Sequence, residues 1–233
     1  MGSKVNTERV YINGKDIIDY GAKALRDYVI GGTPIDNDYF QGRNRSHYTL
    51  MSTTYGMKTI NITIVYFDET MRKASLNRSR LEAEMFNGFE LYMPDGFYYR
   101  SILESIGEAE TKGADGEGVA IEVKYKFLGI QHDPLVTIPD GTSFIAEGTL
   151  PKMDCRLSVT VGADADNYTL GGATFNNVHQ GDVLVVDGIY KRFLKNGAPA
   201  TATGWTGFPS VTMGQNAFLA RDTVKVEFYP CYI

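Results

Sequence analysis

The sequence predicts a mainly β protein of two domains, on three observations. Apolar and polar residues alternate in several runs, which is typical of half-buried strands. One run alone, at about residues 69–87, has helical spacing. A segment rich in proline and glycine, residues 129–142, separates the two parts. We therefore expect an α+β N-terminal domain at residues 1–140 and a C-terminal β-sandwich at residues 141–233.

The composition is that of a folded globular chain. Of the 233 residues, 43% are hydrophobic and 22% charged, which fits neither a disordered chain nor a membrane bundle. The net charge of −5 disfavours a general nucleic-acid-binding surface, which needs a surplus of Lys and Arg. The opening residues, MGSKVNTERVYING, lack the apolar segment of a signal peptide, so we expect neither export nor membrane anchoring.

The first strongly patterned elements are a strand and a helix. Residues 59–67, TINITIVYF, alternate apolar and polar side chains and predict a strand with one buried face. Asp68 is placed to cap the helix that follows, and Gly88 is placed to end it. The apolar stripe of this helix is expected to consist of Met71, Ala74, Leu81 and Met85.

The centre of the predicted helix is polar. Arg78 falls on the apolar stripe, next to Asn77, where a core-facing stripe would be continuous. Two interpretations stay open. Arg78 extends its long side chain outward to solvent, or it forms an ion pair within the chain or with another subunit.

A hairpin is expected after the helix. Pro94-Asp95-Gly96 stands between two aromatic runs, and this turn needs a glycine with positive φ. Residues 107–118, GEAETKGADGEG, are polar and glycine-rich and predict a long loop. Residues 119–129, VAIEVKYKFLG, alternate again and predict a long strand.

The C-terminal part is expected to contain short strands and no helix. Asp187-Gly188 predicts a tight two-residue hairpin turn. The expected strands are Cys155–Val161, Tyr168–Leu170, Val183–Val186, Ile189–Leu194 and Thr223–Tyr229.

No residue pattern indicates catalysis, a metal or a cofactor. The histidines His47, His132 and His179 each stand alone, without a second ligand at metal-binding spacing. Asp164 and Asp166 begin like a calcium loop but lack its glycine and distal glutamate, which favours an ordinary acidic turn. No nucleophile elbow, phosphate loop or dinucleotide fingerprint occurs. We therefore expect a protein that is not an enzyme and binds no cofactor.

The two cysteines, Cys155 and Cys231, are far apart in the sequence and in no metal-binding or redox spacing. Their pattern favours two reduced, partly buried thiols. Such usage fits a protein made in a reducing compartment, the cytoplasm.

Arginine and aromatic residues gather in one short segment, residues 40–48, FQGRNRSHY. Phe40, Arg43, Arg45 and Tyr48 are residue types that contribute most to interface cores, so they are candidate subunit contacts. A solvated loop is the alternative interpretation. Arg78 in the helix is the fifth candidate contact.

Several segments resemble, in order, the distal tail proteins of tailed phages, especially long-tailed phages that infect Gram-positive bacteria. These segments are YINGKDIIDYGAK, YFQGRNRSHYTLMSTTYGMKTINITIVYF, FNGFELYMPDGFYYRSIL and VKYKFLGIQHDPLVT. The closing segments FPSVTMGQN and VKVEFYPCYI resemble the end of the C-terminal domain of the same family. The resemblance spans nearly the whole chain.

This resemblance implies a structural protein of the virion tail tip, made in the host cytoplasm. Members of the family form hexameric rings that join the tail tube to the tail-associated hub protein, with receptor-binding or fibre proteins at the periphery. Residues 1–140 would then be a ring-forming belt domain, and residues 141–233 a galectin-like β-sandwich. DNA would pass through the ring lumen without specific binding. A ring of a phage-derived bacteriocin particle is compatible with the same resemblance.

A carbohydrate-binding module is the alternative function, because a sandwich similar to galectins could hold a sugar of the host surface. Trp205 would then be the residue on which the sugar stacks. The C-terminal part lacks the H-x-N-x-R pattern of sugar-binding galectins, and Trp205 stands in a glycine-flanked segment. The sequence therefore favours the structural function.

Overall fold

In the computed structural model, residues 9–43, 46–113 and 118–233 are described. The chain divides into two compact units between Gln131 and His132, with only the last residue, Ile233, counted with the first unit. This break falls inside the segment 129–142 but precedes the expected boundary at residue 140. Strand β11 (Val136–Ile138) pairs with β21 (Lys225–Phe228), so it belongs to the second unit.

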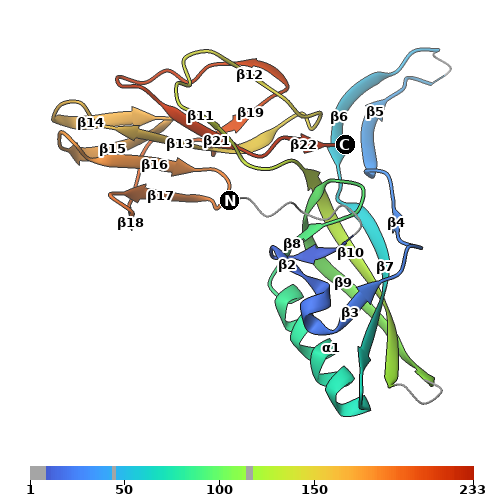
Figure 1. The fold of residues 1–233 in the computed structure, drawn as a ribbon. Helices are drawn as coiled ribbons and strands as arrows, with labels where there is room; N and C mark the ends of the chain where they lie inside the picture. The colour runs from blue at the N-terminus through green and yellow to red at the C-terminus, as the bar shows by residue number, and fades with distance from the viewer. Residues whose placement is uncertain (1–8, 44–45, 114–117) are drawn as a thin grey trace. The chain divides into compact units, whose positions relative to one another are not determined.

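The first unit is built on one sheet. Its strands are β1 (Tyr11–Ile12), β2 (Lys15–Asp16), β3 (Ala22–Ala24), β4 (Val29–Ile30), β7 (Lys58–Asp68), β8 (Phe89–Tyr92), β9 (Tyr98–Gly113) and β10 (Val119–His132). The strand order is β2-β1-β8-β9-β10-β7-β3, and β4 also pairs with β7. A short 3-10 helix, η1 (Ile17–Tyr20), follows β2. Helix α1 (Met71–Met85) runs beside the long strands (Figure 1).

The core of the first unit lies between α1 and the sheet. Strand β7 buries Ile60, Ile62, Ile64 and Tyr66 on one face, as the sequence predicts, and Thr63 and Val65 of the other face are buried as well. Its neighbour β10 buries Ile121, Val123, Tyr125 and Phe127 in the same way. The two strands are antiparallel, with Ile64 opposite Val123, so both apolar rows face one side of the sheet.

Helix α1 is confirmed, but its start differs from the prediction. Thr70, not Asp68, is the N-cap, because its backbone is extended and its Oγ1 accepts a hydrogen bond from the Lys73 amide at 3.3 Å. Asp68 ends β7 and accepts instead from the amide of Glu69 at 2.7 Å. Met71 lies in the first turn and is 40% exposed, so the core-facing stripe is reduced to Ala74, Leu81 and Met85.

The prediction of a loop at residues 107–118 is wrong for residues 107–113, because they form the end of strand β9. Residues 114–117 lie outside the described part of the chain. Strand β9 is extended because it lies beside the strongly patterned β10 in the sheet. Charged side chains pair across the two strands, Lys126 with Glu104 at 3.0 Å and Lys112 with Glu122 at 3.8 Å. Polar residues on an exposed strand are not distinguished from a loop by hydrophobic pattern.

The hairpin at Pro94-Asp95-Gly96 is confirmed. Tyr92 and Tyr98 are paired at the ends of β8 and β9, and the Gly96 amide donates to the Met93 carbonyl at 3.0 Å. Gly96 has φ of 91°, which is the conformation that the turn requires of a glycine.

The second unit is also β throughout, with no helix among its residues. Its main sheet has the order β11-β21-β13-β16-β17-β18, with β19 paired to β13, and two small sheets join β12 to β20 and β14 to β15. The further strands are β12 (Phe144–Ala146), β13 (Met153–Thr160), β14 (Ala165–Leu170), β15 (Ala173–Val178), β16 (Val183–Asp187), β17 (Arg192–Lys195), β18 (Ala198–Pro199), β19 (Ser210–Val211), β20 (Gly214–Asn216) and β22 (Cys231–Tyr232). One core joins these sheets, including Leu157, Phe175, Leu184 and Phe228.

The two-residue turn predicted at Asp187-Gly188 is wrong, because Asp187 pairs with Arg192 and leaves a four-residue loop. Asp187 is fully buried and accepts from the amides of Ile189 and Tyr190, each at 3.2 Å, which shapes the longer loop. Residue 188 must be glycine because there is no space for a side chain at this position. A Cβ there would lie 2.6 Å from the carbonyl oxygens of Cys155 and Pro209.

Candidate assembly surface

Strands β5 (Ile35–Phe40) and β6 (Thr49–Tyr55) form a two-stranded hairpin of their own, separate from the main sheet. The pairing runs from Ile35 opposite Tyr55 to Phe40 opposite Thr49. The register shifts between Asp38 and Tyr39, which leaves Met51 as an extra residue. Figure 1 shows the hairpin continuing beyond β4 and β7.

One face of this hairpin is apolar and covers no core. We call it the apolar face; its apolar residues are Ile35, Tyr39, Leu50, Met51 and Tyr55. The polar pair Asn37 and Thr53, hydrogen-bonded at 2.8 Å, lies on the same face. Tyr39 is 59% exposed and Met51 64% exposed. None of the five belongs to the hydrophobic core of the first unit. A strand pair alone is marginally stable in water, so an uncovered apolar face on such a hairpin indicates a binding surface.

The opposite face is acidic, because side chains alternate across a strand. Asp36 and Asp38 lie on it with Phe40, opposite the hydroxyl-bearing Ser52 and Thr54. All five are exposed. The two strands contain no Lys or Arg. We call these five residues the acidic face.

The candidate contacts predicted in residues 40–48 lie at the far end of the hairpin. Phe40 and Tyr48 are each 67% exposed, and Arg43 is exposed as well. The Tyr48 ring packs edge-on against Tyr39 with 5.9 Å between ring centroids. Arg45 lies outside the described residues.

Sequence reasoning did not find Ile35, Tyr39, Leu50 and Met51, although they make most of the apolar face. The run IDNDYF is too polar to score as a buried strand, and TLMSTTY does not alternate at its bulge. The sequence did offer one indication of this hairpin: a run of residues that favour strands lies on each side of residues 40–48.

Arg78 lies within the first unit. Its Nε donates to Glu82 Oε1 at 2.7 Å, and the two side chains are 27% and 14% exposed. The same Glu82 oxygen accepts from the Tyr125 hydroxyl at 2.9 Å, and Tyr125 meets Tyr66 at 2.7 Å. Arg78 is therefore part of a partly buried hydrogen-bond network, while its neighbour Asn77 donates to Asp68 at 3.0 Å. A contact of Arg78 with another subunit stays a prediction.

Trp205 belongs to an aromatic cluster of the second unit. Its ring lies 4.9 Å from Phe208 and 5.5 Å from Phe193, measured between centroids. These contacts hold the indole against the unit, and 43% of the residue is exposed.

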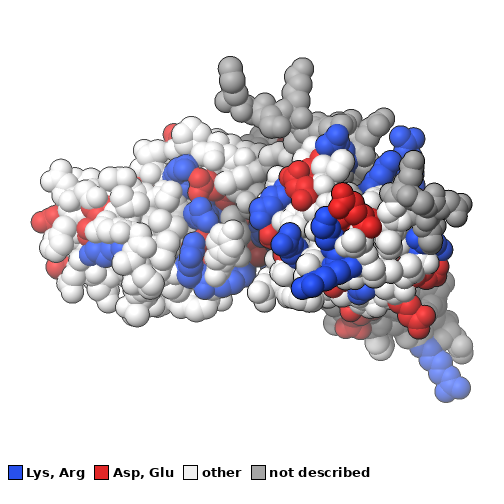
Figure 2. All heavy atoms as spheres, turned by 60° about the horizontal axis from the view of Figure 1, so that its bottom comes forward, with Lys and Arg blue, Asp and Glu red and all other residues white. Residues whose placement is uncertain are grey.

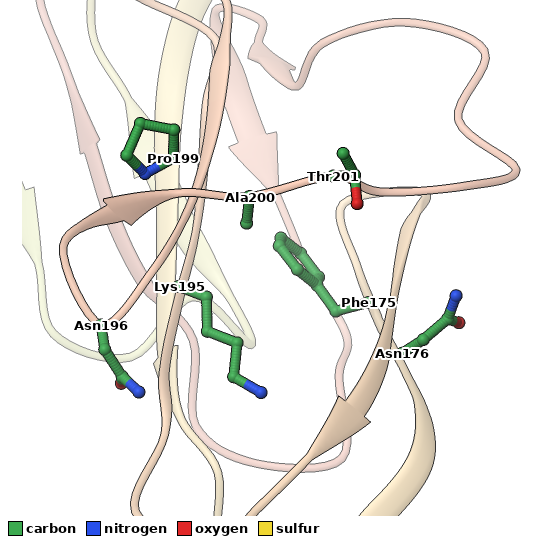
Figure 3. A pocket seen from close by; sticks show the side chains of 7 residues that line it. All are labelled: Phe175, Asn176, Lys195, Asn196, Pro199, Ala200 and Thr201. Atoms are coloured by element: carbon green, nitrogen blue, oxygen red, sulfur yellow. The ribbon is translucent and has the colours of Figure 1, made fainter.

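A hollow of about 630 Å³ in the second unit does not include Trp205. It opens between β15 and the β17–β18 hairpin and is lined by Phe175, Asn176, Lys195, Asn196, Pro199, Ala200 and Thr201 (Figure 3). Phe175 is only 1% exposed and thus offers no ring face for a sugar. The Lys195 ammonium is bonded to Asp182 and to the Asn177 carbonyl, each at 2.8 Å. The hollow therefore lacks the stacking platform that the carbohydrate alternative needs.

The titratable side chains outside these surfaces give no sign of a metal site or of a reactive thiol in the described residues. Within the described ranges, no group of three or more His, Cys, Asp or Glu side chains is placed to hold a metal. Burial raises the pKa of Cys155 to about 12, so this thiol stays protonated near neutral pH.

None of the described helices has the length and apolarity needed to cross a membrane.

Charged side chains of both signs lie near one another on the molecule. Figure 2 shows Lys and Arg side chains interspersed with Asp and Glu on the face in view. Many of the basic groups are paired, among them Lys15 with Glu84 and Lys191 with Asp154, each at 2.7 Å. Arg72 and Arg80 of α1 form no ion pair with the described residues, and both are exposed.

Solved structures provide the comparison with known proteins, since no protein-family model matches and no curated protein does. The chain superposes on the Dit protein of phage SPP1, described as a paradigm of the hub adsorption apparatus in phages that infect Gram-positive bacteria. The TM-score is 0.69 at 13% identity, over 97% of this chain and 99% of that one. A chain of the phage P2 baseplate in its activated conformation with Ca matches with a TM-score of 0.52 at 11% identity, over 92% of each chain. This protein therefore has the fold of the SPP1 Dit protein over nearly its whole length.

Proposed function

We propose that this protein is a structural component of a phage tail tip. It assembles into a hexameric ring through the first unit and joins the tail tube to the tail-associated hub protein. Receptor-binding or fibre proteins attach at the periphery, beside the second unit. Its place is the tip of the virion tail, and it performs no catalysis.

The β5–β6 hairpin is the observation that carries this proposal. A closed ring requires one surface patch that fits a different patch on the next copy. The apolar face supplies such a patch, because its exposed side chains gain stability only when another surface covers them. The likeness to the SPP1 Dit protein supports the same role, since that protein is described as a hub.

Native mass spectrometry of the purified protein tests the assembly. We expect hexamers, or pairs of hexamers. A monomer at tens of micromolar counts against self-assembly, and a monomer that persists with the tube and hub proteins present overturns it.

A variant tests the role of the hairpin. Tyr39→Ser with Leu50→Ser should weaken assembly while leaving Tm unchanged, because neither side chain touches the core. The matched control is Ile145→Ser with Leu219→Ser, which removes two side chains of the second unit that are 77% and 80% exposed. Equal losses of assembly in both variants would contradict the assignment of the contact to the hairpin.

A further inference from the structure

One face of helix α1 is basic, and its arginines form no ion pair with the described residues. Arg72, Leu76 and Arg80 follow each other at intervals of four residues, with Ser79 and Ala83 beside them, so all five share one side of the helix. All five are exposed, and this side is opposite to the buried Ala74, Leu81 and Met85. We call it the arginine face. It contains no acidic residue.

The arginine face and the acidic face of the hairpin are complementary in charge. Asp36 and Asp38 form no ion pair with the described residues, and the same holds for Arg72 and Arg80. Most other charged residues of the first unit have a partner on the same chain, for example Lys73 with Glu69 and Lys126 with Glu104. Among the described residues, these two surfaces of opposite sign thus have no ion-pair partners on the same chain.

The two faces have similar lengths. At about 3.4 Å per residue, Asp36 lies about 7 Å from Asp38 and about 14 Å from Phe40 along β5. At about 1.5 Å per residue, Arg72 and Arg80 lie about 12 Å apart along α1. Each face also carries one large exposed apolar side chain, Phe40 on the hairpin and Leu76, which is 48% exposed, on the helix. Leu76 lies between the two arginines along α1, whereas Phe40 lies two residues beyond Asp38 along β5. Neighbouring charged and apolar side chains of this kind are typical of a specific protein interface.

We propose that the acidic face of the hairpin on one copy docks on the arginine face of α1 on the next copy. This inference rests on the proposed self-assembly and names the two surfaces that meet. The contact is heterologous, so each copy donates one hairpin and receives one, as a closed ring requires.

Two charge-reversal variants test the contact. The first variant carries Asp36→Lys with Asp38→Lys, and the second carries Arg72→Glu with Arg80→Glu. Each variant alone sets like charges against each other at every contact, and we expect at least about a hundredfold weaker association in low salt. An equal mixture of the two should assemble again, with the variants alternating around the ring, because every contact in the mixture is then complementary.

Controls separate this effect from net charge and from folding. Glu147→Lys with Asp166→Lys, and Lys152→Glu with Arg221→Glu, make the same changes in net charge on exposed positions of the second unit. These controls should assemble like the wild type, and all variants should keep the wild-type Tm. Native mass spectrometry of the single and mixed samples gives the readout.

The outcomes distinguish the inference from the proposed function. A wild type that assembles, with variants that assemble equally well, overturns the hairpin–helix contact and leaves self-assembly standing. Loss of assembly that mixing does not restore also overturns the contact. Loss of hub-protein binding by the Arg72→Glu, Arg80→Glu variant, with its ring intact, assigns the arginine face to another acidic partner and overturns the contact between copies. A wild type that never assembles contradicts the proposed function and the contact with it.

Discussion

The Tyr125 hydroxyl donates a hydrogen bond to Glu82, with 2.9 Å between Oη and Oε1, and so joins strand β10 to helix α1 inside the core. Because the Tyr125 proton goes to Glu82, Tyr66 donates to the Tyr125 oxygen at 2.7 Å. Arg78 completes the network by pairing with the same carboxylate at 2.7 Å. A charge in this position is stable only when its partners are present.

Tyr125→Phe should destabilise the protein by about 1–3 kcal/mol, because it leaves the Tyr66 hydroxyl and Glu82 short of a partner in a buried site. Chemical denaturation measures the change. Tyr190→Phe is the matched control, since Tyr190 is 59% exposed and lies in the second unit, outside this network. Equal stability of the two variants would show that the network contributes nothing to the fold.

Stability should fall as pH rises above about 10, the ordinary pKa of tyrosine. Burial is the main cause that raises the pKa of Tyr66 and of Tyr125 above this value. Above pH 10 the unfolded chain therefore releases tyrosine protons that the folded chain keeps, which favours unfolding. Each such tyrosine contributes a loss of about 1.4 kcal/mol per pH unit.

The Tyr125→Phe variant should show a shallower alkaline decline than the wild type, by about 1.4 kcal/mol per pH unit. Unfolding free energies at several pH values between about 9 and 12 give the comparison. Parallel curves for wild type and variant would refute the assignment of this titration to Tyr125.

Gly96→Val should cost about 1–3 kcal/mol, because a β-branched residue is strained at positive φ. The φ of Gly96 is 91°, and nothing lies within 4 Å of a Cβ added there, so the backbone alone causes the loss. Gly32→Val is the control in the same unit, where a Cβ also has free space and φ is not positive. Thermal melts should separate the two variants; a shared Tm would contradict the turn mechanism.

The full chain should bind saccharides no better than millimolar. Trp205 packs on Phe208 and Phe193 and stands outside the hollow of the second unit. Calorimetric titration with host wall polysaccharide measures the affinity. Micromolar binding that Trp205→Ala abolishes and Tyr190→Ala preserves would reverse the ranking of the adaptor and carbohydrate-binding functions.

Double-stranded DNA should not be retained in a gel-shift assay, even at about 50 mM salt, where electrostatic binding is strong. The net charge is −5, and the face shown in Figure 2 mixes both signs. Arg72 and Arg80, the exposed arginines of α1, are assigned to a contact between copies in our proposal. A shift that fades steeply with added salt would mean a basic surface open to DNA, against this prediction.

The sequence by itself determined the mainly β class, the helix and the strands with strong alternation. Ile60, Ile62 and Ile64 show a period of two, and Ala74, Leu81 and Met85 show a helical period, because each element buries one face of its own. The turn at Gly96 was also readable, since its residues prefer that conformation locally.

Only the tertiary structure decided where the polar elements lie. Residues 107–113 are strand because β10 is beside them in the sheet, and Asp187 shapes a four-residue loop because it is buried among amides and arginines. Arg78 looked misplaced in the sequence, yet it pairs with Glu82, which also accepts a hydrogen bond from the distant Tyr125. The β5–β6 hairpin was missed for the same physical reason. The apolar residues of this hairpin cover no core, so apolar and polar residues alternate only weakly along its strands. Pairing between the two strands, and not the local preference of their residues, holds them in an extended conformation.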